Sequence, residues 1–479
     1  MRKYIAIWIM MVLMAWGCDD FLTVKPKSDI KETNLFETAE GCEEAIYGVY
    51  SRLGESDTYG RMMRYYLPEM LAQSYIVSVS NNTINQIRDY QHDGAEAREE
   101  YGSAWSSMYE AIGYVNNVIT NLENVGTGSF KYYDCYLGEM LGLRAFLHFD
   151  LLRLFAPNYT SKPDARAIPY VTKWVPKVTP FSTVKEAYGH VISDLKEAER
   201  LLEASEKIET ATTDDFVTKY RNLHFNLDAA HAMLARVYWM RGDLDSAGFY
   251  AEKVISTEKY HFVEKTEVQN MQASIVTAKE AIWGINQLDP LDQLITNFYQ
   301  ANSAFMPRVD YSGFYSNETQ NVDMRLNWFR VKKNSQEIGD LKTYFLKFFN
   351  EDHYFSPLES TYKGTVGFNL IRISEMYLIA AEALLTTDQV KAMGYYDLVA
   401  TSRNGASLAE LGKAELTRED IDKERYREFF GEGYEWYNMK RENRDLTIHS
   451  SSKVVPGTDE LYTLTIPNDE FDYRYDGEE

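Results

Sequence analysis

The stretch AHAMLARVYWMRGDLDSAGFYAEKVI, residues 230–255, decides the fold class. Its apolar residues recur at three- and four-residue steps, which indicates two amphipathic helices, and Gly-Asp-Leu-Asp at 242–245 supplies a turn between them. The residues that fall at the spacing of the tetratricopeptide pattern are Leu234, Ala235, Tyr238, Gly242 and Ala247. The small side chains among them let two helices approach closely. The stretch therefore predicts an antiparallel helical pair.

Further helical pairs are expected along the chain. Apolar residues follow a helical stripe from Trp105 onward and again from Tyr136 to Phe155, where Pro157 ends the helix. Ser182 is predicted to cap a helix over 182–203, and another pair begins at 370–385. The expected starting points of about four pairs are Thr38, Tyr101, Ser182 to Asn226, and Asn369.

Length and composition limit the class of protein. The 479 residues include 45% hydrophobic and 25% charged residues, which excludes wholesale disorder and a polytopic membrane protein. Length alone suggests two or three domains or one elongated repeat, and each helical pair must bury its apolar face on a neighbour. We predict a mostly α fold, a tetratricopeptide-like scaffold of about four helical pairs with long irregular loop insertions and few short strands, in one mature domain over 18–479.

The net charge limits which classes of molecule the protein is expected to bind. The chain has 50 Lys and Arg against 72 Asp and Glu, a formal charge of −22, which disfavours binding to nucleic acid. It also contains 36 Tyr, a residue that combines an aromatic face with a polar edge.

The N-terminus has the pattern of an export signal. Arg2 and Lys3 precede an apolar run from Ile5 to Gly17, too short for the roughly 20 residues of a spanning helix. Cys18 follows directly, so residues 1–17 resemble a bacterial lipoprotein signal peptide whose cysteine is acylated. A plain signal peptide is the alternative. We expect a lipid-anchored protein of the outer membrane, exposed at the cell surface.

Three irregular stretches interrupt the helices. The longest, 259–368, contains a short strand signal at Ile282 to Ile285, and shorter ones lie at 74–98 and 157–180. Long insertions of distinct composition usually serve a function. We expect these stretches to pack on the scaffold and to carry recognition.

The sequence contains no complete catalytic motif. There is no HExxH, GxSxG, GxxxxGK[ST] or GxGxxG, and two SxxK matches lack their companion motifs. His224 and His231 lie seven residues apart, a spacing more typical of ordinary helix histidines than of a metal site. Cys42 and Cys135 are expected to be buried. We predict neither enzymatic activity nor a metal or other cofactor.

Several segments together resemble a known family. They are CDDFLTVKP, WSSMYEAIGYVNNVI, LRAFLHFDLLRLFAP with AIPYV, STVKEAYGHVISDLKEAERLL, IRISEMYLIAAEALL, ERYREFFGEGYEWYNMKR and LTIPNDEF. In this order they are similar to the SusD/RagB family of Bacteroidetes outer-membrane nutrient-binding lipoproteins. The family's Asn-x-x-Arg-x-Arg run is reduced here to LVATSRNG, and the ending DYRYDGEE lacks the usual Asn-Pro-Gly-Tyr.

The resemblance implies a helical lid for a SusC-like TonB-dependent transporter, binding glycans or, in the RagB branch, peptides, without catalysis. Several motifs are expected to be structural. Asp323 and Arg325 match a family turn, and Trp105 and Trp239 should lie in the core. An ion-pair and packing unit near the C-terminus is expected to contain Glu424, Arg425, Arg427, Glu428, Glu432, Trp436 and Tyr437.

Ligand recognition is expected where aromatic rings and polar groups occur together, since sugars stack their C–H faces on rings. In the family the site is built from loops before the Trp105 helix and from the long insertion. The corresponding residues are Tyr75, Asn82, Arg88, Tyr90 and His92 on one side, and Tyr299, Asn302, Phe305, Tyr311, Phe314 and Tyr315 on the other. For any single aromatic, packing within its own loop is the competing interpretation.

Three functions compete at this point. The leading hypothesis is a surface lipoprotein that binds oligosaccharides, such as starch-like or other glycans, for a transporter. The second is a peptide-binding lid. The third, a secreted glycoside hydrolase, has only the abundance of carboxylates in its favour.

Overall fold

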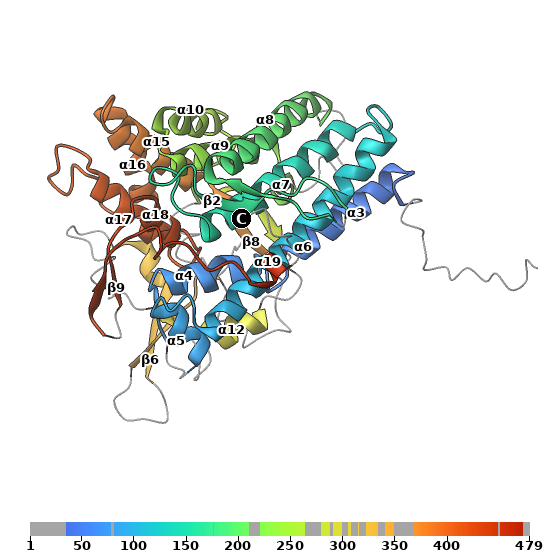
Figure 1. The fold of residues 1–479 in the computed structure, drawn as a ribbon. Helices are drawn as coiled ribbons and strands as arrows, with labels where there is room; N and C mark the ends of the chain where they lie inside the picture. The colour runs from blue at the N-terminus through green and yellow to red at the C-terminus, as the bar shows by residue number, and fades with distance from the viewer. Residues whose placement is uncertain are drawn as a thin grey trace, which may run out of the picture.

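The fold is seen in a computed structural model (Figure 1). The residues described are 35–77, 81–175, 177–209, 221–263, 279–287, 291–298, 305–307, 315, 322–333, 341–348, 367–448 and 451–472. The predicted signal peptide, Cys18 and most of the 259–368 insertion therefore lie outside them.

The helical pair predicted from residues 230–255 is present. α9 (Leu227–Arg241) is capped by Asn226, whose side chain accepts a hydrogen bond from the Ala229 amide, and it ends at Gly242 with φ of 82°. That left-handed conformation suits glycine, which has no Cβ to clash. Asp243 then caps α10 (Leu244–Ile255) by accepting from the Ser246 amide at 3.1 Å. The predicted turn is thus a C-cap followed immediately by an N-cap.

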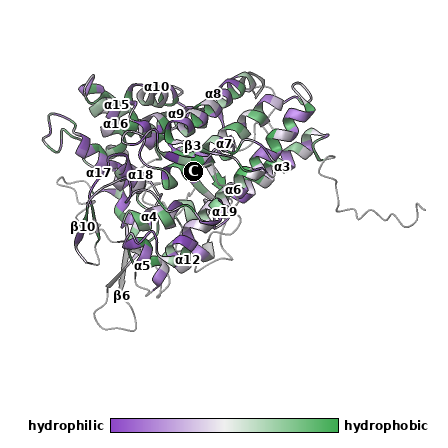
Figure 2. Ribbon diagram, viewed as in Figure 1, coloured by the Kyte–Doolittle hydropathy of each residue, from purple (hydrophilic) through white to green (hydrophobic). Residues whose placement is uncertain are grey.

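The pairs stack into one scaffold. Its other helices are α3 (Ala39–Leu53), α6 (Ala95–Val125), α7 (Tyr133–Phe155), α8 (Val184–Glu209), α15 (Ile373–Leu384) and α16 (Gln389–Ser402). α6 packs on α7, α7 on α8, α8 on α9, α10 on α15 and α15 on α16, so each helix covers its neighbour's apolar face (Figure 1). In Figure 2 these helices carry both hydrophilic and hydrophobic residues, as amphipathic helices should. The predicted fold class is confirmed.

Two predicted boundaries were wrong. Ser182 lies in β3 (Phe181–Thr183), and Thr183 caps α8 in its place. The Thr183 side-chain oxygen accepts a hydrogen bond from the Glu186 amide at 3.2 Å. In return, the Glu186 carboxylate accepts one from the Thr183 amide at 2.8 Å. α6 begins at Ala95, before the predicted start at Tyr101, because its first turns are polar and lie outside the apolar stripe. Part of the expected irregular stretch 74–98 is therefore helical.

The strands form short antiparallel pairs in the described part of the chain. The pairs are β1 (Tyr75–Val77) with β5 (Phe305–Pro307), β2 (Arg166–Pro169) with β3, β4 (Ala281–Asn286) with β8 (Gly367–Arg372), β6 (Phe329–Lys333) with β7 (Leu341–Phe345), and β9 (Leu446–Ile448) with β10 (Lys453–Val455). β4 confirms the predicted strand at Ile282 to Ile285. Gly367 lies against the Ile285 carbonyl, where a Cβ would come within 1.9 Å.

The remaining elements pack around the scaffold, with α4, α5 and α12 below α7, α8 and α9 and with α17 and α18 at the left in the view of Figure 1. They are η2 (Met62–Tyr66), α4 (Leu67–Leu71), α5 (Asn82–Arg88), η3 (Arg221–Leu223), α12 (Leu291–Phe298), η4 (Met324–Trp328), α17 (Arg418–Phe429), α18 (Glu435–Arg441) and α19 (Asp469–Asp472). A hydrophobic core extends from Phe36 to Leu464 and holds Trp105, Trp239, Cys42 and Cys135, all buried as predicted. Among the described residues, no helix is long and apolar enough to span a membrane.

Candidate functional site

A cluster of buried ion pairs closes the C-terminal half of the fold. We call it the C-terminal ion cluster, and its members are Glu280, Asp323, Arg325, Arg372, Arg403, Glu424, Glu428 and Glu432. Glu428 accepts from Arg372 and Arg403 at 2.7 Å each and from Ser374 at 2.9 Å. Burial alone would raise its pKa, but the two guanidinium groups hold the pKa of Glu428 well below its ordinary value.

This cluster confirms the structural interpretation of the charged run at 424–432. Arg325 joins Asp323 and Glu424 at 2.7 Å each, so the Asp-x-Arg turn is also part of it. Arg403 comes from the reduced LVATSRNG segment and still pairs with Glu280 at 2.8 Å. Because the charges are buried and paired, the cluster is a packing device rather than a binding surface.

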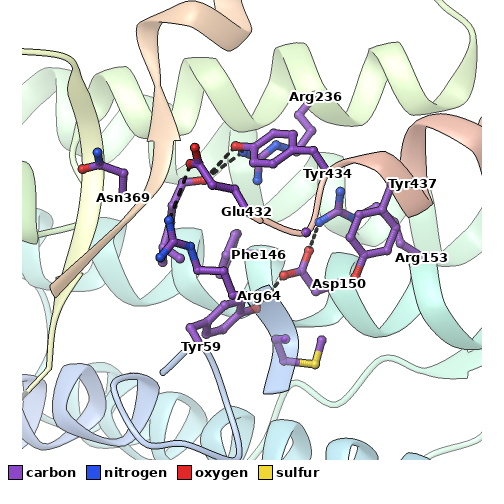
Figure 3. Close-up of a pocket in the computed structure, with 13 residues that line it drawn as sticks. Tyr59, Arg64, Phe146, Asp150, Arg153, Arg236, Asn369, Glu432, Tyr434 and Tyr437 are labelled. Atoms are coloured by element: carbon purple, nitrogen blue, oxygen red, sulfur yellow. Dashed lines mark hydrogen bonds and ion pairs between the residues drawn. The ribbon is translucent and has the colours of Figure 1, made fainter. Parts of the chain in front are cut away.

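A small polar cavity lies between α7 and the segment that leads into α18 (Figure 3). Tyr59 donates to Asp150 at 2.7 Å, Asp150 pairs with Arg153, and the Arg153 guanidinium lies 3.7 Å from the centre of the Tyr437 ring. The cavity volume is about 30 Å³, room for about one water molecule. It is too small for a sugar or a peptide.

An open cleft of about 510 Å³ lies between the end of α7 and the C-terminal segment 459–471. Its volume is within the roughly 300–1,000 Å³ of typical ligand pockets. Phe155 and Leu464 form its buried floor, and Pro157, Ile466 and Phe471 add apolar surface. Its polar lining consists of Arg98, Lys162, Arg166, Asp459, Glu460, Thr463, Thr465 and Asn468. An apolar floor with a polar rim is the usual composition of a ligand site.

An aromatic and cationic stack forms one side of this cleft. The rings of Phe181 and Phe471 stack with centres 5.6 Å apart, and the exposed Arg166 guanidinium lies 5.3 Å and 5.1 Å from them. β3 positions Phe181 and α19 positions Phe471. The stack holds Arg166 in place while its hydrogen-bonding groups remain accessible to a ligand.

Hydrogen bonds fix the C-terminal wall of the cleft. Asp459 accepts from the Asn158 amide at 3.0 Å and from the Ser161 hydroxyl at 2.8 Å, and Lys162 pairs with Glu460 at 2.7 Å. The bond from Lys162 lowers the pKa of Glu460 to about 2, so this carboxylate is ionised at neutral pH. The cleft thus offers both anionic acceptors and cationic donors at fixed positions.

Three of the predicted ligand residues are buried in the core. Tyr75 and Phe305 stack with ring centres 5.2 Å apart across the β1–β5 pair, and Tyr315 donates to the Arg427 carbonyl at 2.9 Å. Their exposed fractions are 4%, 2% and 1%. The expectation that they form a ligand surface is therefore corrected: these rings pack the protein interior, because each faces other rings instead of solvent.

Four predicted residues lie at or near the surface, and one of them, His92, contacts the C-terminal segment that lines the cleft. Asn82 is exposed, and Arg88, Tyr90 and His92 are partly exposed. Arg88 pairs with Asp89, and Tyr90 donates to the Leu71 carbonyl at 2.7 Å. His92 Nε2 lies 2.9 Å from the Leu461 carbonyl, so this loop supports the C-terminal wall. Tyr299, Asn302, Tyr311 and Phe314 lie outside the described residues, and ligand contact stays a prediction for them.

The two histidines do not share a helix face. His224 precedes α9 and lies 3.1 Å from Glu139, whereas His231 lies within α9 and 3.1 Å from Glu199. Burial of Glu139 is outweighed by His224 and Arg221, which lower its pKa to about 2. Within the part of the chain that the structure describes, no group of three or more candidate side chains is arranged to hold a metal ion.

The cleft residues were not predicted as a site. Arg98 donates to the Asn468 side chain from 370 residues away, and no spacing in the sequence indicates that contact. The available signal was that AIPYV and LTIPNDEF, both part of the family resemblance, are rich in residues that end helices. Phe471 belongs to the second of these segments.

Comparison with known proteins agrees with this architecture. Residues 20–239 match a family described as starch-binding and associating with the outer membrane, and residues 334–460 match the SusD family. The chain belongs to the SusD/RagB family. A SusD-like protein of Formosa agariphila is 28% identical over 42% of this chain, a match that spans only 39% of the relative's length. A SusD-like protein of Bacteroides ovatus is 22% identical over 91% of this chain and 82% of its own.

Solved structures of the SusD superfamily share the fold. One from Bacteroides thetaiotaomicron superposes with a TM-score of 0.73 at 22% identity, covering 91% of this chain and 97% of that one. Surface glycan-binding protein A from Bacteroides uniformis gives a TM-score of 0.67 at 20% identity, covering 90% and 95%. The likeness to both structures shows that this chain shares their fold.

Proposed function

We propose that this SusD-family chain is a cell-surface lipoprotein that binds oligosaccharides in the cleft and delivers them to a SusC-like TonB-dependent transporter. The observation that carries the proposal is the open cleft of about 510 Å³ with its stack of Arg166, Phe181 and Phe471. Family membership and the glycan-binding name of the Bacteroides uniformis neighbour support the ligand class.

The cleft residues take separate roles in this proposal. Phe471 offers a ring against which the C–H face of a sugar stacks. Arg98, Arg166 and Asn468 present hydrogen-bond donors to sugar hydroxyls, and Glu460 presents acceptors. Binding of this kind involves no bond cleavage, so the protein holds its ligand without turning it over.

Calorimetry against a broad glycan panel tests the proposal. We expect binding of at least one oligosaccharide with a dissociation constant in the micromolar range, about −8 kcal/mol, and no product after prolonged incubation. Absence of binding to every glycan, or cleavage of the bound sugar, would disprove it. A Phe471→Ala variant assigns binding to the cleft, and Phe249→Ala on α10, which removes an exposed ring that does not line the cleft, is the control.

Peptide binding is the second candidate because of the cations on the cleft rim. Arg98 in α6, Lys162 just before β2 and Arg166 at the start of β2 line one opening. Such an arrangement also suits the carboxylates of a peptide. Binding of peptides without binding of glycans in the same screen would select this function.

The lipid anchor is tested separately. A Cys18→Ala variant should lose both palmitate labelling and association with the outer membrane, because the thiol is the proposed site of acylation. Retention of either property would contradict the anchor. Copurification with a TonB-dependent transporter from solubilised membranes tests the proposed partner.

A further inference from the structure

A buried lysine connects the two walls of the cleft. Lys440 in α18 is 2% exposed, and its ammonium group donates to the Arg153 and Ala156 carbonyls at 2.6 Å each and to the Tyr462 carbonyl at 2.8 Å. The first two carbonyls are at the end of α7, and the third belongs to the C-terminal wall. Ala156 and Tyr462 are each adjacent in sequence to residues that line the cleft, and Arg153 lies two residues before Phe155 of its floor.

We propose that Lys440 is a positioning residue of the cleft, and that its protonation determines how firmly the C-terminal wall is held against α7. The proposal rests on the binding role proposed for the cleft and adds a form of regulation to it. An ammonium group has three N–H donors, which matches the three carbonyls. A neutral amine has two donors and a lone pair, so loss of the proton leaves one carbonyl without its hydrogen bond.

The environment of Lys440 allows this loss near neutral pH. Burial lowers the pKa of Lys440 to about 7, with Arg153 acting in the same direction and Asp459 opposing it. As the pH rises through about 7, two donors are therefore left for the three carbonyls, which weakens the bridge between the end of α7 and the C-terminal wall.

The other titratable groups near Lys440 with a shifted pKa are His92, Tyr437, Arg441 and Arg153. Burial lowers the pKa of His92, on the loop after α5, which favours its neutral form. On α18 itself, burial raises the pKa of Tyr437, and burial lowers the pKa of Arg441 only to about 10. Burial of Arg153 is outweighed by Asp150, which raises the pKa of this guanidinium, so it stays charged. Lys440 is thus the group among these whose protonation changes.

Other contacts hold α7 and α18 together when this lysine is changed. Asn158 donates to the Lys440 and Arg441 carbonyls at 3.0 Å and 2.8 Å, and the Leu464 amide donates to the Leu154 carbonyl at 2.9 Å. The Arg153 guanidinium also packs on the Tyr437 ring. Because these contacts do not use the Lys440 side chain, its variants are expected to fold.

Hydrogen exchange of the full chain, followed by mass spectrometry, tests the proposal without any ligand. The measured quantity is the protection factor of residues 459–466, corrected for the intrinsic pH dependence of exchange, at about pH 6.5 and about pH 8.5. In the wild type we expect protection to fall about threefold to tenfold. Lys440→Arg, which stays charged, should keep high protection at both pH values. Lys440→Gln, with two donors, should show low protection at both.

Global stability provides an independent readout. The unfolded state binds a proton that the folded state has lost between pH 7 and 10.5, so the contribution of Lys440 to the free energy of unfolding rises with pH. Between about pH 6.5 and about pH 8.5 the proposal thus expects two opposite changes. The protection of residues 459–466 falls, whereas the contribution of Lys440 to the free energy of unfolding rises. A wild-type segment whose protection does not change, or an equal fall in Lys440→Arg, would overturn the proposal. Neither result bears on whether the cleft binds glycans.

Discussion

The C-terminal ion cluster and the cleft are both rich in charge, yet they differ in access to water. In the cluster, Arg325 and Arg403 are each 1% exposed and Glu428 is fully buried, and each charge meets an opposite charge. In the cleft, Arg166 is exposed beside an open volume. Buried charge must be satisfied by the fold itself, whereas exposed and oriented charge is available to a ligand. Burial, not charge density, therefore separates the structural region from the candidate binding region.

The largest predicted effect is the loss of Glu428. Glu428→Ala removes one of the two carboxylates that Arg372 and Arg403 share and leaves Glu280 alone between these buried cations, so we expect a loss of about 3–5 kcal/mol in the free energy of unfolding. Urea denaturation followed by circular dichroism measures it. If the cost is comparable to that of a surface substitution, the cluster does not hold the fold together.

Acid should weaken the same region. Burial of Glu432 is outweighed by Arg372 and Lys347, which lower its pKa from 4.5 to about 2. Because its pKa is lower in the folded state than in the unfolded state, ionised Glu432 contributes about 3 kcal/mol to the free energy of unfolding. This contribution is fully present above pH 4.5 and is lost as the pH falls towards 2. Urea denaturation of wild type and Glu432→Gln across that range measures it. The variant should show a flatter pH dependence; identical slopes would exclude Glu432 as the cause.

The helical scaffold was predictable because its signals are local. The spacing in residues 230–255 and Pro157 after Phe155 each depend on a few neighbouring residues, and both were confirmed. The predicted helix starts at Ser182 and Tyr101 were wrong because a capping pair defines one boundary and a polar first turn the other, and neither shows apolar periodicity. Local propensity thus determines which helices form more reliably than where they begin.

The candidate site was far less predictable, because burial depends on contacts between distant segments. Tyr75, Phe305 and Tyr315 are aromatic loop residues in sequence, yet the β1–β5 pair and the neighbouring rings bury them. Arg166 and Phe471 are unremarkable in sequence and meet only in the folded chain. Composition identifies residues capable of recognition, and tertiary packing selects which of them are exposed.

In the cleft, removal of one ring should affect binding without unfolding the protein. Phe471→Ala takes away a partly exposed ring of the stack, so we expect about a tenfold loss of affinity for the glycan selected by the panel, ~1.4 kcal/mol. Calorimetry measures the affinity and urea denaturation the stability. Phe249→Ala should change neither quantity appreciably. If Phe471→Ala instead lowers stability as much as Glu428→Ala, the stack is structural and the contrast between the two regions fails.

The smallest predicted effect concerns an exposed ion pair on the same helix as Glu428. Lys423 and Glu419 are 2.6 Å apart, closer than the 2.7 Å contact between Glu428 and Arg403, but their side chains are 56% and 76% exposed. Water and salt screen such a pair, and two long side chains lose freedom to form it. Glu419→Ala should therefore leave the urea midpoint unchanged within the error of the unfolding curve. A shift approaching that of Glu428→Ala would mean that distance, and not burial, sets the strength of ion pairs on α17.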